Sequence, residues 1–515
     1  MQEQQKFDNK IIRRMAKGTG IVLIGNIASK VAGFAFYVLI IRYITQEEFG
    51  LFSLGLAIIN IVVVLSALGI GQGLPRFISY QLGKKEYSKA WGGIVSSFKI
   101  CSFASLLFAF LLFFLADGIS QFLNKPGLSN TIKILALAIP LITISNLLIS
   151  QLRANQNVVG RTFFGNLLRP ITAIILILLV MLYRLPFNWV LYAYIISFTI
   201  TLIPLFFYAK RKIASSIPTA KRSAVTKELL LFSLPLLGTG MLSQILVRLD
   251  TLVLGYFVSA PSIGLYNSAL RITLLIPFVL NAANFLYLPV ASKLFSQNKI
   301  EEITKIYALI TKWTFILTLP CFLYIFFASD LVLHFCFGPS YTAAKIPLQI
   351  LSLAYFIHVI FGMNIMTCIA IGKPRILLYS QIIALSTNLI LNILLIPPYG
   401  IAGAAIASCI SLILHNVLTT VFVYRYSRIY PFSKSYLRII LFAVGICIIF
   451  FLLPITHYLN NNISLILFFL TISLIGVFIT KNFTEEEIDI IGYIEEKITK
   501  DKRFTNKVAK KFIKH

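Results

Sequence analysis

The sequence predicts an all-α polytopic membrane protein with about fourteen transmembrane helices. Two observations on composition favour this fold class: 58% of the 515 residues are hydrophobic and only 12% are charged, against about 25% charged in an ordinary soluble domain. The third is that the apolar residues form blocks of roughly 20, the length of helix that crosses a bilayer core about 30 Å thick. A soluble fold of this length could not bury so much apolar surface, so we expect the helices to face lipid.

The apolar blocks follow one another along the whole chain, separated by polar turns. A basic segment precedes the first block, which is too long for a cleaved signal peptide and is therefore expected to be retained as a span. The predicted spans are Gly18 to Ile41, Leu51 to Leu74, Gly93 to Leu115, Ile132 to Leu152, Phe163 to Tyr183, Trp189 to Tyr208, Leu229 to Phe257, Gly264 to Leu288, Ile306 to Ala328, Ile346 to Ile371, Ile376 to Ile396, Ile401 to Tyr424, Leu437 to Leu459 and Ile463 to Thr480.

The formal net charge of +28 is concentrated in alternate loops. Lys84, Lys85 and Lys89 lie in one such loop, and the loops between the basic ones hold almost no lysine or arginine. Lysine and arginine on short loops stay on the cytoplasmic side. The alternation therefore predicts a protein of the cytoplasmic (cell) membrane with an even number of spans and both termini cytoplasmic. Nucleic-acid binding is not expected, because the basic residues form neither one long run nor a basic-aromatic motif.

The segment 481–515 differs in composition from the rest of the chain. Thr484 and Glu487 have the spacing of a capping box, which predicts the start of a surface helix, and seven lysines and arginines follow between Lys500 and Lys514. Basic residues near the inner leaflet each gain about 1 kcal/mol from anionic headgroups. We therefore expect a cytoplasmic amphipathic and basic tail that contacts anionic membrane lipids, the alternative being a solvated tail.

The two halves of the chain match at a shift of 214 residues. Gly50–Phe52 falls on Gly264–Tyr266, and Leu74–Pro75 falls on Leu288–Pro289. The repeat predicts two pseudo-symmetric six-helix bundles plus two extra C-terminal helices. Repeats with an even number of spans share one orientation, so their axis runs along the membrane normal, and paired bundles of this kind enclose a central cavity that opens alternately to either side. The expected domains are an N-terminal lobe 1–208 (helices 1–6), a basic cytoplasmic linker 209–228, a C-terminal lobe 229–424 (helices 7–12), helices 13–14 at 425–480 and the tail 481–515.

Among the charged residues inside predicted spans, Lys30, Arg248, Asp250 and Arg271 are the candidates for a functional site. A charge at the centre of the bilayer costs about 2.5 to 3.5 kcal/mol on translocon-insertion scales, so each is expected to face a cavity or a partner. Helical spacing assigns two of them to polar stripes. The stripes are Asn26, Lys30, Gly33 and Tyr37 in helix one, and Gly240, Gln244, Arg248, Thr251 and Gly255 in helix seven, and the 214-residue shift superposes Asn26, Lys30 and Tyr37 on Gly240, Gln244 and Thr251.

These residues are the candidate site. We expect Lys30 and Arg248, with the polar side chains of their stripes, to line the cavity, with structural pairing as the alternative. Asp250 has two interpretations, an ion pair with a base such as Arg271 or a coupling site for a proton or cation. Arg271 either contributes to the cavity or extends to the outer interface, and Arg76 either anchors topology or flanks a cytoplasmic mouth. Arg153 and Arg169, near cytoplasmic helix ends, are interpreted as topology anchors.

Catalytic and metal-binding patterns are absent from the sequence. There is no Walker loop, HExxH or GxSxG motif, the five histidines are scattered, and the six cysteines form no CxxC pair. We therefore expect no enzyme activity, metal or cofactor. A basic cavity without a catalytic constellation favours an anionic substrate, and the lack of a nucleotide site argues against an ATP-driven pump.

Two stretches resemble the polysaccharide flippases of the multidrug/oligosaccharidyl-lipid/polysaccharide exporter superfamily. The first is GTGIVLIGNIASKVAGFAFYVLIIRYITQEEFGLFSL with ALGIGQGLPRFISYQLGKKEYSKA from Ala67 to Ala90, and the second is GKPRILLYSQIIALSTNLILNILLIPPYGIAGAAIAS from Gly372 to Ser408. The resemblance covers nearly the whole chain and implies a V-shaped, two-lobed, MATE-like transporter. It would flip a polyprenyl-(di)phosphate-linked oligosaccharide from the cytoplasmic to the outer leaflet by alternating access.

The resemblance also implies residue roles. Lys30 and Arg248 would bind the phosphates of the lipid, and helices 13 and 14, Leu437 to Thr480, would form a groove for its tail. The drug-exporting branch has cation-binding carboxylates that the first lobe lacks here. Two alternatives remain: a multidrug/cation antiporter centred on Asp250, and a non-transporting membrane scaffold for glycan-synthesis enzymes. Glycosyltransferases or a polymerase of the same pathway are possible partners, and a monomer is expected because no separate association motif is visible.

Overall fold

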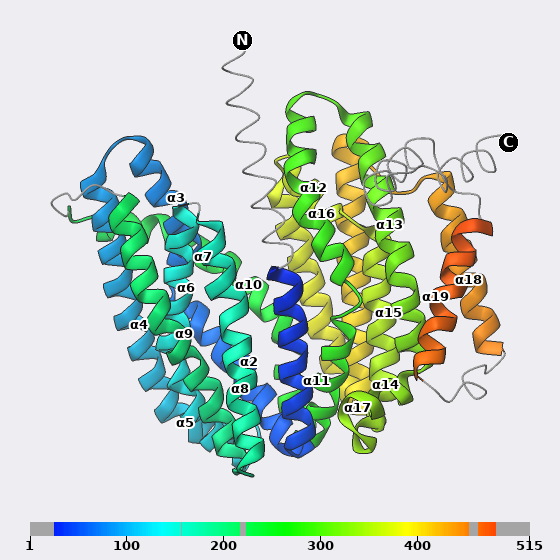
Figure 1. The fold of residues 1–515 in the computed structure, drawn as a ribbon, viewed down its shortest axis with the longest axis horizontal. Helices are drawn as coiled ribbons and strands as arrows, with labels where there is room; N and C mark the ends of the chain where they lie inside the picture. The colour runs from blue at the N-terminus through cyan, green and yellow to red at the C-terminus, as the bar shows by residue number, and fades with distance from the viewer. Residues whose placement is uncertain (1–24, 156, 217–222, 453–461, 480–515) are drawn as a thin grey trace, which may run out of the picture. The chain divides into compact units, whose positions relative to one another are not determined.

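A computed structural model describes residues 25–155, 157–216, 223–452 and 462–479 (Figure 1). Every regular element within these residues is a helix, which confirms the predicted all-α class. The tail helix predicted after Thr484 lies outside the described residues.

The chain divides into two compact units. Unit 1 comprises Met1–Leu275, Asp330–Ala354 and Lys373–Thr419, and unit 2 comprises Ile276–Ser329, Tyr355–Gly372 and Thr420–His515. These units have other boundaries than the lobes expected from the sequence, which stay a prediction.

Unit 1 holds most of the helices. They are the N-terminal helix Gly25–Tyr43, α2 (Gln46–Ser66), α3 (Ile70–Gly83), α4 (Tyr87–Phe122), α5 (Pro126–Ala136), α6 (Ala138–Ala154), α7 (Val158–Thr162), the π-helical turn η1 (Phe163–Leu168), α8 (Arg169–Leu182), α9 (Phe187–Ser216), α10 (Thr226–Phe257), α11 (Ala260–Thr273), nearly all of α14 (Ser329–Phe337), the 3₁₀ turn η2 (Pro339–Ala344), the start of α15 (Lys345–Phe361) and most of α17 (Pro374–Ser427).

Unit 2 contains α12 (Phe278–Ser296), α13 (Ile300–Phe327), the end of α15, α16 (Asn364–Ala370), the end of α17, α18 (Lys434–Leu452) and α19 (Asn462–Ile479). The two C-terminal helices α18 and α19 both pack against α13.

Eleven helices in the described part of the chain are long and apolar enough to cross a membrane, or twelve if the bent pair α5 and α6 is one span. The predicted count of fourteen is therefore not confirmed. The two spans predicted on either side of Gly400 correspond to the two arms of α17, which meet at a kink where Gly400 is non-helical (φ 56°, ψ −133°). The arms pack against each other, because Ser380 is hydrogen-bonded to Thr419 at 3.0 Å and Asn388 Nδ2 donates to the Ser411 hydroxyl at 3.1 Å. The last predicted span corresponds to the 18-residue helix α19.

A capping box fixes the turn between the N-terminal helix and α2. The Thr45 side chain accepts a hydrogen bond from the Glu48 backbone N–H, and the Glu48 carboxylate accepts one from the Thr45 N–H at 2.9 Å. Both bonds satisfy backbone donors that a helix start leaves without partners. The sequence Thr-Gln-Glu-Glu therefore ends one helix and starts the next within a few residues.

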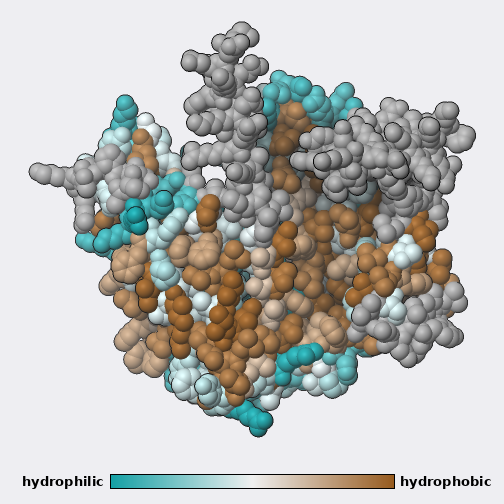
Figure 2. Space-filling view, in the orientation of Figure 1, coloured by the Kyte–Doolittle hydropathy of each residue, from teal (hydrophilic) through white to brown (hydrophobic). Residues whose placement is uncertain are grey.

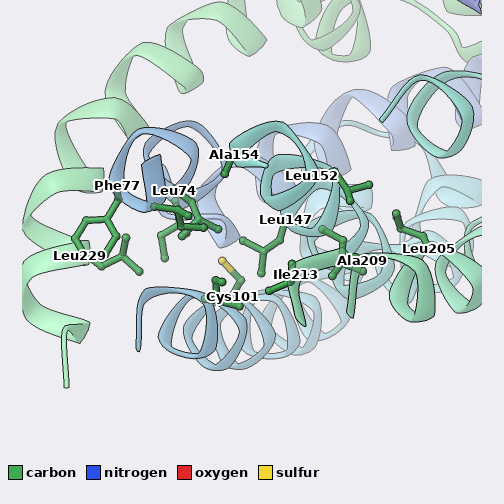
Figure 3. Packing of buried hydrophobic residues seen from close by; sticks show 14 of the residues in the cluster. Leu74, Phe77, Cys101, Leu147, Leu152, Ala154, Leu205, Ala209, Ile213 and Leu229 are labelled. Carbon is green, nitrogen blue, oxygen red and sulfur yellow. The ribbon is translucent and has the colours of Figure 1, made fainter. Parts of the chain in front are cut away.

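The apolar core of the first part of unit 1 is formed by α3, α4, α6, α9 and the start of α10 (Figure 3). Leu74 and Phe77 of α3 lie among side chains such as Cys101 of α4, Leu147 of α6 and Leu229 of α10. All five are nearly inaccessible to solvent. Burial of an apolar side chain of this size is worth about 1.5 to 3 kcal/mol, so this cluster holds these helices together.

Helices α2 and α11 cross at two glycines. A Cβ on Gly50 would lie 1.8 Å from the Ala260 carbonyl oxygen, and a Cβ on Gly264 would lie 2.2 Å from the Gln46 carbonyl oxygen. The 214-residue shift relates Gly50 to Gly264 and Gln46 to Ala260. The contact therefore has the symmetry that the internal repeat predicts, and small residues let the two backbones touch.

Large apolar side chains also cover the outside of the helices. On the face shown in Figure 2, apolar residues cover the middle of the helices and hydrophilic residues gather toward their ends. Phe103 and Phe110 of α4 and Leu182 of α8 are more than half exposed. Such a band is what helices surrounded by lipid tails require, and it agrees with the membrane location predicted from composition.

Unit 2 contains a broken helix. Between α15 and α16, Gly362 has φ +58°, and a Cβ there would lie 2.0 Å from Thr311 Oγ1. Two tyrosines satisfy carbonyls freed by the break: Tyr307 donates to the Phe361 oxygen at 2.7 Å, and Tyr436 of α18 donates to the Ile360 oxygen at 2.9 Å. Irregular backbone in an apolar setting persists only where its polar groups find partners in this way.

Candidate functional site

The predicted stripe of the N-terminal helix contains exposed and half-buried residues. Asn26 and Lys30 are exposed, and Tyr37, two turns after Lys30, is half-buried. Asn166 of η1 donates a hydrogen bond to Asn26 Oδ1 at 2.6 Å. Lys30 pairs with no carboxylate among the described residues, so its charge is available to a ligand.

Arg271 of α11 is stacked on Tyr37. Its guanidinium carbon lies 3.7 Å from the centroid of the ring, well inside the range of about 6 Å for cation–π contact. The Nε of Arg271 is buried and has no hydrogen-bond partner. An arginine that stacks on an aromatic ring keeps its N–H groups directed outward in the ring plane, where they fit the oxygens of a phosphate or carboxylate.

Arg248 of α10 has the same unsatisfied geometry. It is half-buried, and its Nε is likewise buried without a partner. Arg248 and Arg271 are close enough to repel each other electrostatically, and both interact with the phenol of Tyr194 on α9. No described carboxylate pairs with either arginine. Two arginines within electrostatic range of each other, and with no described carboxylate beside them, favour the binding of an anion.

Asp250 is hydrogen-bonded to neutral side chains and to neither of these arginines. Its Oδ1 accepts from Asn392 Nδ2 at 2.8 Å, and its Oδ2 accepts from the Tyr266 hydroxyl at 2.7 Å and from the Ser408 hydroxyl. The predicted alternative of an ion pair with Arg271 is therefore wrong, because within the described chain three neutral donors surround the carboxylate. Hydrogen bonds to the charged form let a carboxylate persist in an apolar setting.

One donor of this group has an unused atom. Asn392 is fully buried, and its Oδ1 has no hydrogen-bond partner, while its Nδ2 is shared between Asp250 and Asn388 Oδ1. Asn392 contacts Asp250 through Nδ2, so the carboxylate itself is the hard oxygen ligand here that suits a proton or a small cation.

Only part of the predicted α10 stripe is accessible. Gln244 and Arg248 are half-buried, but Thr251 is 3% exposed and hydrogen-bonded to Asn267 Oδ1 at 3.2 Å, and Gly255 packs on Leu54. The expectation that the whole stripe lines a cavity is therefore wrong at its far end, where the small residues serve helix packing.

The sequence places both Arg76 and Arg169 near helix ends, but their surroundings in the structure differ. Arg76 is exposed, 5.6 Å from the ring centroid of Phe232. Arg169 is half-buried, and its guanidinium carbon lies 4.7 Å from the centroid of Phe198 and 5.8 Å from that of Tyr194. Arg169 therefore contacts Tyr194, the tyrosine that lies within electrostatic range of Arg248 and Arg271, which its position at a helix end does not indicate.

Sequence reasoning missed the polar residues around Asp250 and the role of Tyr194. One signal was available: Asn388 and Asn392 are four residues apart in an apolar block, and that spacing places two amides on one helix face. The described residues contain no group of three or more His, Cys, Asp or Glu that could hold a metal ion.

Comparison with known proteins identifies related sequences. Residues 15–295 match the model of a family described as "Polysaccharide biosynthesis protein". The chain is 25% identical over 382 residues to a Haloferax volcanii protein named "Probable low-salt glycan biosynthesis flippase Agl15", covering 73% of this chain and 76% of that protein. It is 24% identical over 482 residues to membrane protein MJ1068 of Methanocaldococcus jannaschii, covering 88% and 92%.

Solved structures share the fold. The lipid II flippase MurJ in an inward closed conformation superposes with a TM-score of 0.71 at 19% identity, covering 89% of this chain and 97% of that one. An inward-facing multidrug resistance MATE family transporter of the MOP superfamily gives a TM-score of 0.62 at 16% identity, covering 80% and 98%. The fold is therefore that of a polytopic membrane transporter.

Proposed function

Because the chain belongs to the polysaccharide biosynthesis protein family, we propose that it flips a polyprenyl-linked oligosaccharide from the cytoplasmic to the outer leaflet by alternating access. The oligosaccharide would be joined to its carrier through one or two phosphates. The name of the relative Agl15, a glycan biosynthesis flippase, and the transporter fold support this proposal.

The observation that carries it is the pair Arg248 and Arg271, whose buried Nε atoms have no partner and which pair with no described carboxylate. A buried charged donor left without a partner costs more than the 1 to 3 kcal/mol typical of a neutral group. An anionic headgroup would remove that cost when it binds.

The exposed residues of the N-terminal helix extend this site in the proposal. Lys30 lies seven residues before Tyr37 and on the same helix face, so it would meet the headgroup or the first sugar, with Asn26 and Gln244 as neutral hydrogen-bonding partners. Arg76, exposed beside Phe232, would flank the cytoplasmic mouth. A cationic cluster of this kind repels cationic drugs, which disfavours the multidrug antiporter alternative.

Asp250 would couple transport to an ion. Its neutral donors and the unused Asn392 Oδ1 make a place where a proton or a cation exchanges without breaking an ion pair.

We place both termini in the cytoplasm, the chain in the cell membrane as a monomer, and glycosyltransferases or a polymerase of the same pathway among its partners. The groove for the polyprenyl tail would lie along α18 and α19, and the basic tail 481–515 would contact anionic lipids.

The test is flipping by the purified full chain in vesicles that contain a fluorescent polyprenyl diphosphate oligosaccharide. Arg248→Gln and Arg271→Gln each remove charge-assisted hydrogen bonds worth about 1.5 to 3 kcal/mol, so each should slow the initial rate about tenfold or more. Arg184→Gln is the matched control, because Arg184 is exposed just beyond the far end of α8.

Wild-type rates in both site variants would contradict the proposed headgroup site. A wild-type chain that does not flip the lipid, and that co-purifies with glycosyltransferases, would favour the scaffold alternative instead.

A further inference from the structure

A π-helical turn sets the position of Arg169. The turn η1 (Phe163–Leu168) ends where α8 begins, at Arg169, and Pro170 follows. A π-helical turn is rare and strained, and such turns are frequent at functional sites because the extra residue redirects the side chains that follow. The irregular backbone therefore decides where Arg169 points.

Two aromatic rings on α9 support its guanidinium. Tyr194 and Phe198 are 6% and 5% exposed, and their ring centroids lie 5.3 Å apart. The guanidinium carbon of Arg169 is 4.7 Å from the Phe198 centroid and 5.8 Å from the Tyr194 centroid. Within the described residues this side chain donates no hydrogen bond and pairs with no carboxylate. Its N–H groups are therefore oriented by stacking and remain available to a ligand.

Tyr194 connects Arg169 to the other two arginines. The phenol interacts electrostatically with Arg169, Arg248, Arg271 and Tyr37. Three arginines from α8, α10 and α11 thus lie within electrostatic range of one tyrosine. Arg169 is stacked on its ring, and no described carboxylate pairs with any of the three. Since like charges gathered in an apolar setting are costly, this excess of positive charge needs an anion with more than one negative charge.

We propose that Arg169 is a third headgroup-binding residue, which contacts the second phosphate of a lipid diphosphate and gives the site a preference for diphosphate over monophosphate. The inference rests on the proposed function, because it adds a contact to the same site. The charges favour it: a diester of monophosphate carries one negative charge and a diester of diphosphate carries two, against three uncompensated arginines. Arginine is suited to this role because its planar fork matches phosphate oxygens.

The experiment measures binding of three probes to the full chain in nanodiscs: a polyprenyl diphosphate sugar, the polyprenyl monophosphate sugar of equal chain length, and inorganic diphosphate. Arg169→Gln should lower the affinity for the diphosphate lipid about tenfold, or about 1.4 kcal/mol. It should change the affinity for the monophosphate lipid by less than about threefold. Arg271→Gln should weaken both lipids, because it tests the headgroup site itself. Arg184→Gln should leave both unchanged.

Rescue separates a ligand contact from a structural role. Arg169→Lys keeps the positive charge, so it should bind the diphosphate lipid more tightly than Arg169→Gln does. If Arg169 served only packing, the two variants would bind this lipid equally well. Phe198→Leu removes the ring beneath the guanidinium and keeps every charge. Like Arg169→Gln, it should lower the preference for the diphosphate lipid over the monophosphate lipid. This second variant carries the test if Arg169→Gln does not fold.

Three results would overturn the proposal: unchanged diphosphate affinity in Arg169→Gln, an equal loss for both lipids, or no effect of Phe198→Leu in a case where Arg169→Gln is unfolded. Inorganic diphosphate that binds as tightly as the lipid would overturn the assignment to a lipid headgroup. If Arg271→Gln leaves the affinity for both lipids unchanged while Arg169→Gln abolishes the preference for diphosphate, the proposed role of Arg271 is wrong and the assignment of Arg169 stands.

Discussion

The crossing of α2 and α11 gives the sharpest structural prediction. In Gly264→Ala, the new Cβ would lie 2.2 Å from the Gln46 carbonyl oxygen and 3.2 Å from both the Gln46 carbonyl carbon and the Gly50 nitrogen. All three atoms belong to helix backbone, so no side chain can move to relieve the clash. Ordinary contact begins at about 3.4 Å, and the two helices must therefore separate by about 1 Å.

That separation costs packing along the whole crossing. Inserting a methyl group into a closely packed site typically costs about 1 to 3 kcal/mol, which corresponds to about a 5- to 150-fold change in an equilibrium constant. We expect Gly264→Ala to lower the thermal denaturation midpoint of the purified chain in detergent clearly below that of the wild type. Gly50→Ala should behave in the same way, because the contact is symmetric.

Gly118→Ala is the matched control. Nothing lies within 4 Å of a Cβ at Gly118, which is near the C-terminal end of α4, and alanine favours a helix over glycine by up to about 1 kcal/mol. This variant should therefore be as stable as the wild type or more stable. A Gly264→Ala protein with the midpoint of Gly118→Ala would refute the packing argument.

Three further variants test other contacts. Asp250→Asn should abolish the dependence of flipping on a sodium or proton gradient while lipid binding persists, and an unchanged ion dependence would exclude Asp250 as the coupling group. Tyr436→Phe removes the donor to the carbonyl at the end of α15 and should destabilise the chain by about 1 to 3 kcal/mol, seen as a lower denaturation midpoint, whereas Tyr183→Phe, at an exposed position, should not. Arg42→Gln removes two hydrogen bonds to the carbonyls of Phe335 and Cys336 and should lower the midpoint by a similar amount, and equal midpoints would show that water replaces these bonds.

The sequence identified which residues near Tyr37 are candidates for the site, but it did not predict which of their side chains are in contact. Charges inside apolar blocks are visible without coordinates, so Arg248 and Arg271 were candidates from the start. The stacking of Arg271 on Tyr37 depends on how α11 packs beside the N-terminal helix, which spacing within one helix does not specify. For the same reason Thr251 was assigned to a cavity, although it is buried against α11.

Asp250 shows the limit most clearly. Its partners Asn392 and Ser408 are 142 and 158 residues away along the chain, and neither carries a charge that would have marked it. Arg169 does carry a charge, but an arginine at a helix end is usually a topology anchor, so the sequence did not indicate a role in the site. Only the π-helical turn and the two rings of α9 show that its guanidinium points elsewhere.

By itself the sequence determined that this chain is a bundle of membrane helices with an internal repeat, because apolar block length and loop charge respond to the bilayer, a solvent whose thickness is known beforehand. Tertiary structure decided where these helices are kinked or broken, as at Gly362 and Gly400, and which polar side chains meet. Those outcomes depend on side-chain packing between helices far apart in the chain, where a difference of one turn moves a residue from a packed interface to an accessible site.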